Sequence, residues 1–475
     1  MGGLVIEAVS VQDLFDKQKE YFATDVTKTY EWRVDQLNRL THMLKDNYER
    51  FADASRRDFK TASQENAFEV SASIATSEFA KSQLKEWMKP VETPLPKFLA
   101  ASGHKGMVYR EPYGVTLIIC PFNGPLLLSL RPAVGVLSAG NPCILKLSEA
   151  LLATDELLLE LIPKYFEPEA LSAVVGGREV VTNLLKLPFD FMFLTGSVGV
   201  GKVVMRAAAE NLTPVLLELG GQNPVIVDET ANIPDAAKKI VWGAMAWGGQ
   251  WCTSPGYAVV HESVAEGFVA ECKKAVVELY GKDPKSNSDY SRVISATAVE
   301  RLASLIDPTK VVYGGKSDAA ARYLDRPSST RFRGPTKSWK TKSLGRFCLS
   351  SLTPNLDVTR KGQVAPQPLA GYVFSRNQQA IDRVLQSLSF GGGAVNQTNV
   401  FLFIESMPYG GVGTSGIGNY YGKYGYDSLT HAKSVLISPP DVAIEHLFPP
   451  YTLEKVDTNH GHWSLLKSLS LPGAI

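Results

Sequence analysis

Apolar positions in the first part of the chain follow a helical period. They recur at three- and four-residue spacing among charged residues, at Val11, Leu14, Phe15, Trp32, Leu37, Leu40 and Leu44. This period predicts amphipathic helices over residues 9–58, and a similar pattern predicts helix over residues 62–90. Such helices usually cover a core with their apolar face.

From residue 109 onward, short apolar runs predict strands that alternate with helices. A hairpin-like turn is expected over residues 109–114, followed by a strand at 115–120, a short strand within 139–149, a strand that begins at 191 and a strand at 215–219. One helix is expected to begin near Pro125 and a second at the Ser-Glu pair 148–149. A third is expected to follow the Gly-rich turn 195–201 and to end near residue 210. This alternation from 113 to 219 predicts an α/β fold with a doubly wound parallel sheet.

The pattern continues with a helix-like run at 241–247, a Gly- and Pro-rich turn, and a strand at 257–260. Helices are then expected over 262–280 and 291–305, and a strand with its turn over 311–315. A chain of 475 residues with this organisation is expected to form two or three structural units.

Composition narrows the functional classes. The chain is 44% apolar and 20% charged with a net charge of +1, so it shows no global attraction to nucleic acid. Its five cysteines form no metal-ligand spacing and no disulfide framework, which suits a reducing compartment. We see no signal peptide and no apolar run near the ~20 residues of a membrane span, so we expect a cytoplasmic protein.

One cysteine is the strongest candidate for chemistry. Cys252 lies in the turn Gly248-Gly-Gln-Trp-Cys-Thr-Ser-Pro-Gly256, between a helix-like and a strand-like run. A thiol held by backbone amides at such a junction can act as a nucleophile in its thiolate form. The other four cysteines, Cys120, Cys143, Cys272 and Cys348, are expected to be small buried side chains.

A carboxylate upstream is the matching candidate for a base. Glu218 stands between two leucines at the end of a strand-like run, before Gly220-Gly-Gln-Asn-Pro224. In a dehydrated place it can act as a general base near neutral pH. The alternative is a strand-end glutamate that faces solvent.

Other strand ends carry candidate binding groups. Asn123 follows one strand, where its amide can donate to an oxyanion, or is an ordinary turn asparagine. Lys146 and Glu149 follow the next strand and can each bind a ribose hydroxyl, although a solvated lysine is the simpler alternative. The turn Thr195-Gly-Ser-Val-Gly-Val-Gly201 exposes amides at a helix start, which suits a pyrophosphate, although a Gly-rich turn alone is weak evidence.

Together, Glu218-Leu-Gly-Gly-x-Asn-Pro and Gly249-Gln-x-Cys252 resemble the NAD(P)-dependent aldehyde dehydrogenase superfamily in order and spacing. The resemblance extends to Pro-Phe-Asn123, Lys146-Leu-Ser-Glu149, Leu194-Thr-Gly-Ser-x-x-x-Gly201 and the closing stretch 408–418. Leucines replace the usual proline and phenylalanine in the second and third of these. Residues 420–433 resemble the class 3 branch, which includes fatty and aromatic aldehyde enzymes and fungal apocarotenal enzymes, with Thr430-His-Ala-Lys a looser match. The resemblance covers about residues 10–450, apart from one segment.

The resemblance implies an aldehyde dehydrogenase-like fold with a Rossmann-like cofactor domain, an α/β catalytic domain and a small oligomerisation element. The expected boundaries are 1–218 for NAD(P) binding, 219–400 for catalysis, 401–450 for closing and oligomerisation, and 451–475 for the tail. The implied cofactor is NAD or NADP. Its expected binding residues are Lys146, Ser148, Glu149, Gly196, Ser197, Gly201 and Gly220.

The resemblance also implies a mechanism with three catalytic residues. Cys252 attacks an aldehyde, Asn123 stabilises the oxyanion, and Glu218 activates water to release the acid. Trp251 and Phe122 would favour an apolar, long-chain or aromatic aldehyde, although Trp251 equally suits a core position. We expect a homodimer, and we favour a frayed C-terminal tail over a peripheral membrane contact through it.

The segment at residues 326–352 does not fit the family. It carries seven basic residues and no acidic one from 326 to 346, where the family has a glutamate that holds the nicotinamide ribose. The sequence Met-Glu-Asp-Glu-Ile-Phe-Gly-Pro-Ile-Leu, read from the second nucleotide of suitable codons, reproduces Trp339 to Cys348. We therefore expect a shifted reading frame here. An evolved basic loop is the competing interpretation.

Two alternative functions remain open at this point. A catalytically impaired relative would keep the fold and lose turnover, which the missing glutamate favours. An acylating dehydrogenase would use the same cysteine without a base, which Glu218 argues against.

Overall fold

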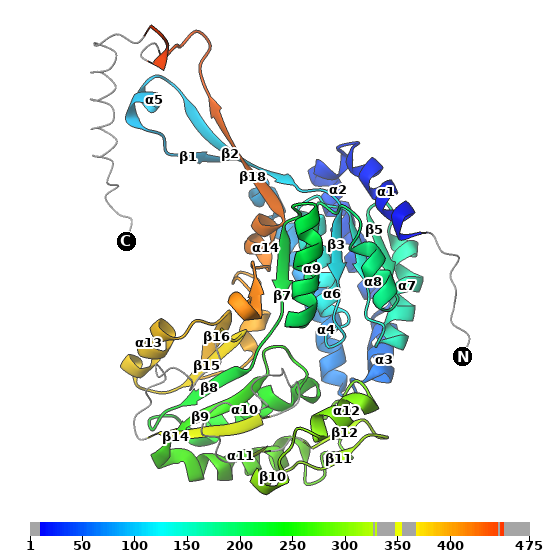
Figure 1. Cartoon of the computed structure of the whole chain (residues 1–475), viewed down its shortest axis with the longest axis vertical. Helices are drawn as coiled ribbons and strands as arrows, with labels where there is room; N and C mark the ends of the chain where they lie inside the picture. Colours follow the sequence, from blue (N-terminus) through cyan, green and yellow to red (C-terminus); the bar gives the residue numbers. More distant parts are fainter. Residues whose placement is uncertain (1–9, 326–327, 330–346, 354–366, 445–446, 451–475) are drawn as a thin grey trace.

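The computed structural model describes residues 10–325, 328–329, 347–353, 367–444 and 447–450. Two sheets flanked by helices form the body, and a third, smaller sheet projects from it (Figure 1). The α-helices are α1 Val11–Phe22, α2 Tyr30–Asp46, α3 Tyr48–Asp58, α4 Ser63–Trp87, α5 Lys97–Ala101, α6 Leu127–Ser138, α7 Leu152–Tyr165, α8 Arg178–Leu184, α9 Val198–Glu210, α10 Ile233–Met245, α11 Ala265–Tyr280, α12 Ala296–Ala303, α13 Gln378–Ser387 and α14 Gly422–Ser428.

A six-stranded sheet forms the first α/β unit, in the order β17-β7-β6-β3-β4-β5. Its strands are β3 Thr116–Ile119, β4 Cys143–Lys146, β5 Leu171–Val174, β6 Phe191–Thr195, β7 Val215–Glu218 and β17 Gly416–Ile417. Strands β3 to β7 are parallel and β17 pairs antiparallel with β7. The expected doubly wound parallel sheet is confirmed.

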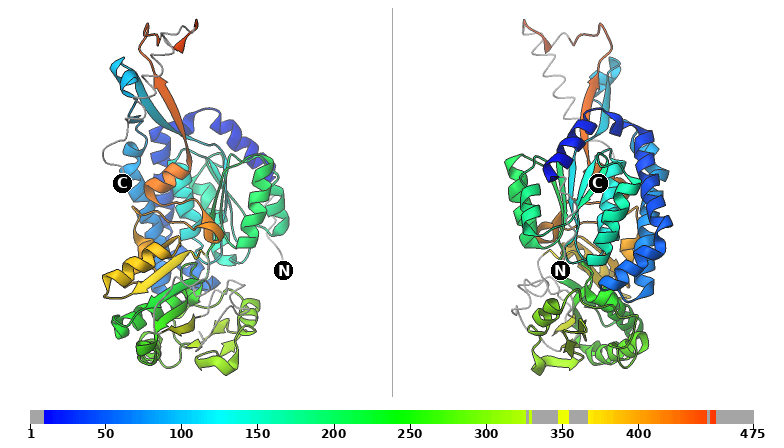
Figure 2. Two further views of the ribbon diagram at one scale, coloured as in Figure 1. Left: turned by 60° about the vertical axis from the view of Figure 1, so that its left-hand side comes forward. Right: turned by 90° about the vertical axis from the view of Figure 1, so that its right-hand side faces the viewer.

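Strand alternation explains why helices cover both faces of this sheet. Leu117 and Ile119 pack with α1, α8 and α9 on one face, whereas Ile118 packs with α2, α4 and α6 on the other. Because successive side chains of a strand point to opposite faces, fully apolar strands require cover on both sides. Figure 2 shows this three-layer arrangement from two further directions.

A seven-stranded sheet forms the second unit, in the order β10-β13-β14-β9-β8-β15-β16. Its strands are β8 Asn223–Val227, β9 Pro255–His261, β10 Val311–Tyr313, β13 Ser328–Ser329, β14 Phe347–Thr353, β15 Ala370–Phe374 and β16 Gly392–Val395. Helices α10 and α11 pack on one face and α13 on the other. A small hairpin of β11 Ser317–Asp318 and β12 Tyr323–Leu324 lies beside α12.

The projecting sheet joins distant parts of the chain. It consists of β1 Val91–Thr93, β2 Lys105–Pro112 and β18 Thr430–Ile437, all antiparallel. Strand β18 pairs with β2 along its full length. The predicted hairpin-like turn at 109–114 is therefore wrong for residues 109–112, because a partner more than 300 residues away continues the strand.

Two other local predictions need correction. The helix expected over 291–305 covers only α12, because Arg292 N donates to Phe59 O and Val293 N to Arg322 O, which ties this stretch to distant segments. The helix expected from 148–149 begins at Leu152 instead. The helices over 9–58 and 62–90 are confirmed, with a break at Asp25, where φ is 63°.

Within the described ranges, no helix combines the length and apolar character needed to cross a bilayer. The tail 451–475 and most of the segment 326–352 lie outside the described residues. The predictions of a frayed tail, with a peripheral membrane contact as its alternative, and of a shifted-frame segment therefore concern residues mostly outside the described ranges.

Candidate active site

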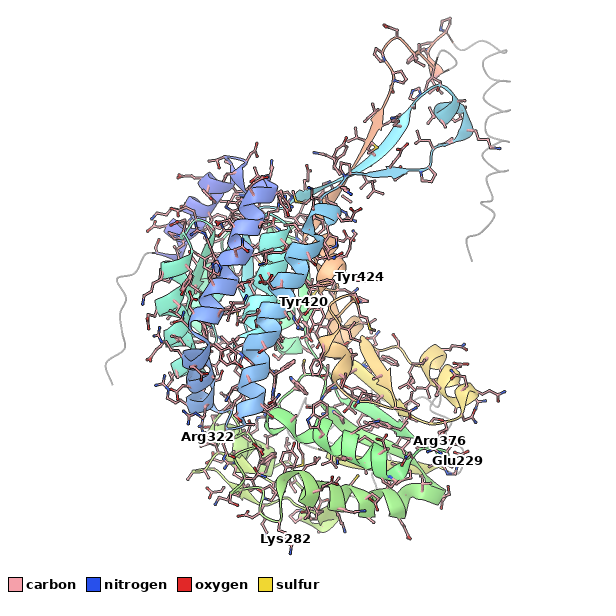
Figure 3. All side chains as sticks on the ribbon, turned by 180° about the vertical axis from the view of Figure 1, so that it is seen from behind. Glu229, Lys282, Arg322, Arg376, Tyr420 and Tyr424 are labelled. Atoms are coloured by element: carbon pink, nitrogen blue, oxygen red, sulfur yellow. The ribbon has the colours of Figure 1, made fainter. Side chains whose placement is uncertain are left out.

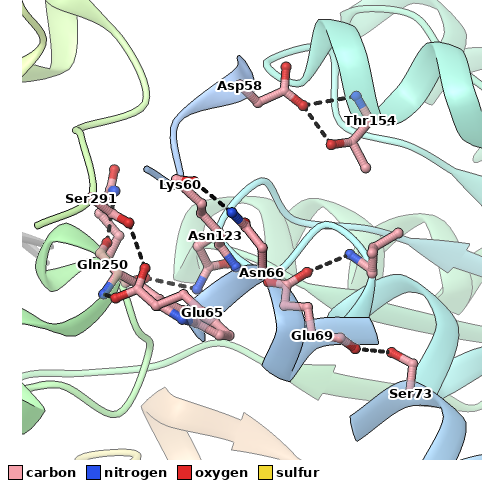
Figure 4. Close-up of polar contacts among 12 residues, drawn as sticks. Asp58, Lys60, Glu65, Asn66, Glu69, Ser73, Asn123, Thr154, Gln250 and Ser291 are labelled. Atoms are coloured by element: carbon pink, nitrogen blue, oxygen red, sulfur yellow. Dashed lines mark hydrogen bonds and ion pairs between the residues drawn. The ribbon is translucent and has the colours of Figure 1, made fainter. Parts of the chain in front are cut away.

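A sharp backbone kink lies between α10 and the turn that carries Cys252. After α10, the 3₁₀ helix η2 (Ala246–Gly249) contains three successive residues with positive φ, namely Trp247 at 56°, Gly248 at 61° and Gly249 at 71°. A tryptophan rarely adopts this conformation. Half-buried Glu65 supports it, because its Oε1 accepts a hydrogen bond of 2.6 Å from Trp247 N. Glu65 Oε2 accepts another of 2.6 Å from Ser291 Oγ (Figure 4).

Gln250 connects this turn to Asn123. The Gln250 side chain donates to Arg292 O (2.9 Å) and accepts from Ile294 N (3.0 Å), and its own carbonyl accepts from Asn123 Nδ2 (2.9 Å). Asn123 is 5% exposed and follows β3. An amide nitrogen carries two hydrogens, and this bond uses one of them.

Asn223, at the start of β8, holds the turn from the other side. Its Nδ2 donates to Cys252 O (2.8 Å) and Ser254 O (2.9 Å), and its Oδ1 accepts from Ala370 N (2.9 Å). Asn223 is 1% exposed, so these bonds replace water completely. Tyr372 adds a further restraint, because its hydroxyl donates to Thr253 O (2.8 Å).

Cys252 and Glu218 meet through a third residue. Cys252 Sγ lies 3.1 Å from Tyr409 Oη, and Tyr409 Oη donates to Glu218 Oε1 at 2.8 Å. Cys252 is 7% exposed, Tyr409 3% and Glu218 0%. Burial raises the pKa of the Tyr409 hydroxyl well above its usual value, and the neighbouring Cys252 and Glu218 raise it further. The tyrosine is therefore neutral at physiological pH.

A tight loop mounts Tyr409 over Glu218. Tyr409 and Tyr420 exchange backbone hydrogen bonds, and β17 within the loop pairs with the end of β7, where Glu218 lies. Two glycines are required for this close packing, since a Cβ on Gly410 would meet Gly418 O at 2.2 Å and one on Gly411 would meet Ser415 O at 2.1 Å. The Gly-rich closing stretch therefore supplies a side chain as well as backbone.

Buried charges lie next to the kink. Lys60 is fully buried, pairs with Glu69, and places Nζ 3.5 Å from the centre of the Trp247 ring. Burial lowers the pKa of Lys60 well below its usual value and raises that of Glu65 to about 7. Figure 4 shows how these groups from α4 and the chain before it reach the same region as Asn123 and Gln250.

Three of the other cysteines are small buried side chains, as expected. Cys120, Cys143 and Cys272 are buried, and desolvation raises the pKa of each thiol, to about 12 for Cys120 and higher for the other two. They are confirmed as buried core residues. The side chain of Cys348 lies outside the described residues.

The cofactor candidates lie at one edge of the six-stranded sheet. Strand order changes direction between β3 and β6, and ligands of such sheets bind at the carboxyl ends of the strands at this point. There Ser197 caps α9 by accepting from Val200 N, and the buried Thr195 Oγ1 has no hydrogen-bond partner among the described residues. An orphaned hydroxyl beside a helix N-terminus fits a phosphate-bearing cofactor.

The remaining candidates lie nearby, and they differ in exposure. Lys146 ends β4, 3% exposed, and its Nζ contacts Glu149 Oε2 at 2.7 Å, while Glu149 is exposed and Ser148 half-buried. Gly201 packs in α9 under Leu219. Gly220 has φ 110° and donates its N–H to Ser415 O at 3.2 Å.

Trp251 belongs to an aromatic cluster beside the nucleophile. Its ring centroid lies 4.5 Å from that of Trp247 and 5.9 Å from that of Trp242, and Trp251 is 5% exposed. Phe122 is half-buried and packs edge-on against Phe59.

Sequence reasoning missed three residues that build this site. Asn223 and Tyr409 lie inside motifs that the sequence displays, but the motifs say nothing about what each side chain contacts. Glu65 lies on a helix nearly 190 residues before Cys252 in sequence, and no local signal distinguishes it from a surface glutamate.

The fold and the strand-end site define an α/β enzyme with a nucleotide-binding sheet. The aldehyde dehydrogenase family model matches residues 6–328 and 364–435. The 4,4'-diaponeurosporen-aldehyde dehydrogenase of Staphylococcus aureus is 36% identical over 93% of this chain and 96% of its own length. Aldehyde dehydrogenase family 3 member B1 of Rattus norvegicus is 34% identical over 93% and 95%. The solved structure of substrate-bound Staphylococcus aureus AldH is 34% identical, with a TM-score of 0.89 over 97% and 99%.

The chain belongs to the aldehyde dehydrogenase family, whose members oxidise aldehydes to acids with NAD or NADP. The resemblance seen in the sequence, including its class 3 character, is confirmed. The family match is interrupted between residues 328 and 364, the region that contains most of the non-matching segment.

Proposed function

We propose that this protein oxidises an apolar, long-chain or aromatic aldehyde to its acid, with Cys252 as nucleophile and Glu218 as base. One observation carries this proposal. Cys252 Sγ and Glu218 Oε1 are linked through a single hydroxyl in a buried site, and Asn123 bonds to the same turn. A nucleophile, a base and an oxyanion donor are the groups that acyl-transfer chemistry requires.

Three residues, Cys252, Asn123 and Glu218, have distinct roles in this reaction. The Cys252 thiolate adds to the aldehyde carbon, and the second N–H of the Asn123 amide stabilises the oxygen that becomes negative. Bound NAD or NADP would accept the hydride that leaves this carbon, which then becomes the carbonyl carbon of a thioester with Cys252. Glu218 then takes a proton from water as that water attacks the thioester carbon, which frees the acid and the thiolate.

We propose that the cofactor lies over the carboxyl ends of β3, β4 and β6. Gly196, Ser197 and the α9 N-terminus would receive the pyrophosphate, with Gly201 and Gly220 allowing close backbone packing. Lys146, Ser148 and Glu149 would hold the adenosine ribose. The two large sheets would thus correspond to cofactor and catalytic domains, divided near residue 218, and residues 401–450 would close the site and form the oligomer contact.

An apolar substrate is supported by the surroundings and by a relative. The region beside Cys252 is rich in aromatic rings, including Trp251, Trp247 and Phe122. The relative in Staphylococcus aureus is named for a diaponeurosporen aldehyde.

We propose a homodimer in which the projecting sheet makes the contact, because β18 leaves Leu436 and Ile437 about half exposed. Light scattering on the purified protein tests this directly.

The deciding experiment is NADH or NADPH production from decanal and from benzaldehyde, with Cys252→Ala as control and the acid product identified by mass spectrometry. We expect turnover with the native protein, loss of it in the variant, and free acid as the product. An acyl thioester in place of acid would favour an acylating enzyme. Cofactor binding without turnover by folded protein would favour an impaired relative and overturn the proposal.

A further inference from the structure

We propose that Tyr409 is a catalytic residue that passes the proton of the Cys252 thiol to Glu218 and then hydrogen-bonds the thiolate. This inference rests on the proposed function, since it concerns how the same nucleophile becomes reactive. The proposed function gives roles to Cys252 and Glu218 but none to Tyr409, which lies between them.

A tyrosine hydroxyl has a single proton to donate. Tyr409 Oη donates that proton to Glu218 Oε1 at 2.8 Å, so the contact of 3.1 Å with Cys252 Sγ requires the thiol to be the donor. The three groups therefore form one directed chain, from sulfur through oxygen to carboxylate. No water is needed between them, because both links are of direct hydrogen-bond length.

Transfer of one proton along each of the two hydrogen bonds produces the Cys252 thiolate. The S–H bond of Cys252 breaks as its proton forms a bond to Tyr409 Oη, and the original tyrosine proton moves to Glu218 Oε1. The products are a thiolate, a neutral tyrosine that now donates to the sulfur, and a protonated Glu218. One proton has moved from sulfur to carboxylate and no charge has left the site. Glu218 loses this proton to solvent before it serves as base, since the overall oxidation releases protons.

The surroundings hold Tyr409 in the geometry that this transfer needs. Its ring stacks on Tyr421 at 4.9 Å, and Tyr420 packs edge-on at 5.5 Å. The titratable groups that face it are Cys252 from the turn before β9, Glu218 from β7, and Tyr420 and Tyr421 from its own loop. Arg131 of α6 lies 4.1 Å from the Tyr421 ring, on which Tyr409 stacks, and pairs with Glu405.

The transfer has a measurable signature. A thiolate that forms by internal transfer keeps a constant population while the pair as a whole holds one proton, so its reactivity is independent of pH over that range. An isolated thiol with a pKa of ~8.5 instead becomes about tenfold more reactive for each pH unit below that value.

The experiment is the rate of Cys252 alkylation by iodoacetamide from about pH 6 to pH 8, with the labelled peptide quantified by mass spectrometry. The native protein is expected to show a plateau. Tyr409→Phe is expected to lose it, with a rate that rises about tenfold per pH unit. Glu218→Gln is expected to lose it as well, and the double variant to match the single variants, because each change breaks the same chain.

Tyr420→Phe is the matched control. Tyr420 is 2% exposed, and its hydroxyl has no hydrogen-bond partner among the described residues, so the change removes one buried hydroxyl from the same loop. Figure 3 shows Tyr420 within the body of the molecule, in contrast to the exposed Tyr424. We expect this variant to keep the plateau. Circular dichroism of each variant establishes that it is folded.

A plateau that persists in Tyr409→Phe would overturn the proposal, as would an ordinary thiol titration in the native protein. The assay uses neither aldehyde nor cofactor. A protein that shows the plateau but oxidises no aldehyde would contradict the proposed function and leave the proton transfer intact, so the two failures are distinguishable.

Discussion

Replacement of Asn223 by alanine tests how the Cys252 turn is held. The change deletes three hydrogen bonds in a site that is 1% exposed. A typical buried hydrogen bond contributes about 1 kcal/mol, and a buried group left without its partner costs about 1–3 kcal/mol. Since Ala370 N and two carbonyls lose their partner, we expect the free energy of unfolding to fall by roughly 3–5 kcal/mol.

The same change should reduce catalysis in the protein that remains folded. Asn223 contacts the carbonyls of Cys252 and Ser254, and so fixes the backbone on both sides of Thr253. A displacement of the reacting atoms by about 1 Å can cost ~100-fold in rate, so we expect kcat to fall by about that factor. The assays are urea denaturation for stability and steady-state aldehyde oxidation below the unfolding transition for kcat.

Asn141→Ala is the control for this experiment. Asn141 is 0% exposed, accepts from Gly114 N and donates to Leu429 O, both at 2.9 Å. It lies before the amino end of β4 in the six-stranded sheet, whereas Asn223 begins β8 in the seven-stranded sheet. Its loss should lower stability by about 2–3 kcal/mol and leave kcat unchanged. Equal effects of the two variants on kcat, or a normal kcat in Asn223→Ala, would refute the claim that Asn223 positions the nucleophile.

Three further predictions address separate features. Asn123→Ala should lower kcat about 10²–10³-fold and leave Cys252 alkylation unchanged, because the lost donor acts on the oxyanion. Burial raises the pKa of Asp155 from 3.8 to about 8, so the folded state keeps a proton that the unfolded state loses, and the free energy of unfolding should fall as pH rises through this range. Urea denaturation should show Asp155→Asn equal to the native protein near pH 4 and more stable near pH 8 by on the order of a few kcal/mol. Resequencing of the transcript should reveal the Met-Glu-Asp-Glu-Ile-Phe-Gly-Pro frame at 326–352, and an uninterrupted shifted frame in the mRNA would remove the error explanation.

The sequence predicted features that depend on local pattern. The helical period over 62–90 predicted α4, and the apolar run 191–195 followed by a Gly-rich turn predicted β6 and α9, because their periods are intrinsic to each element. Strand β2 escaped prediction at 109–112 because its partner β18 is supplied by a distant segment. Local turn residues cannot reveal a pairing of that kind.

In the site as well, the sequence revealed reactive residue types but not the contacts that depend on tertiary structure. Cys252 and Glu218 were identifiable because their chemistry and setting are unusual in sequence. The role of Tyr409 was not identifiable, because it depends on a backbone hairpin to Tyr420 and on the pairing of β17 with β7, which together aim one hydroxyl between two distant groups. A tyrosine in a Gly-rich stretch carries no mark of this in its local sequence.

The segment at residues 326–352, which does not match the family, is expected to affect cofactor binding. The contacts described for Cys252, Tyr409, Glu218 and Asn123 join the turn before β9, the closing loop, β7 and the turn after β3. The missing glutamate, by the family resemblance, would have held the cofactor ribose. A lesion in this segment that spares folding should therefore impair hydride transfer, because the cofactor ribose loses that contact. Normal Cys252 alkylation together with absent turnover would identify the cofactor side as the site of the defect, and recovery of turnover on restoring the frame would establish the cause.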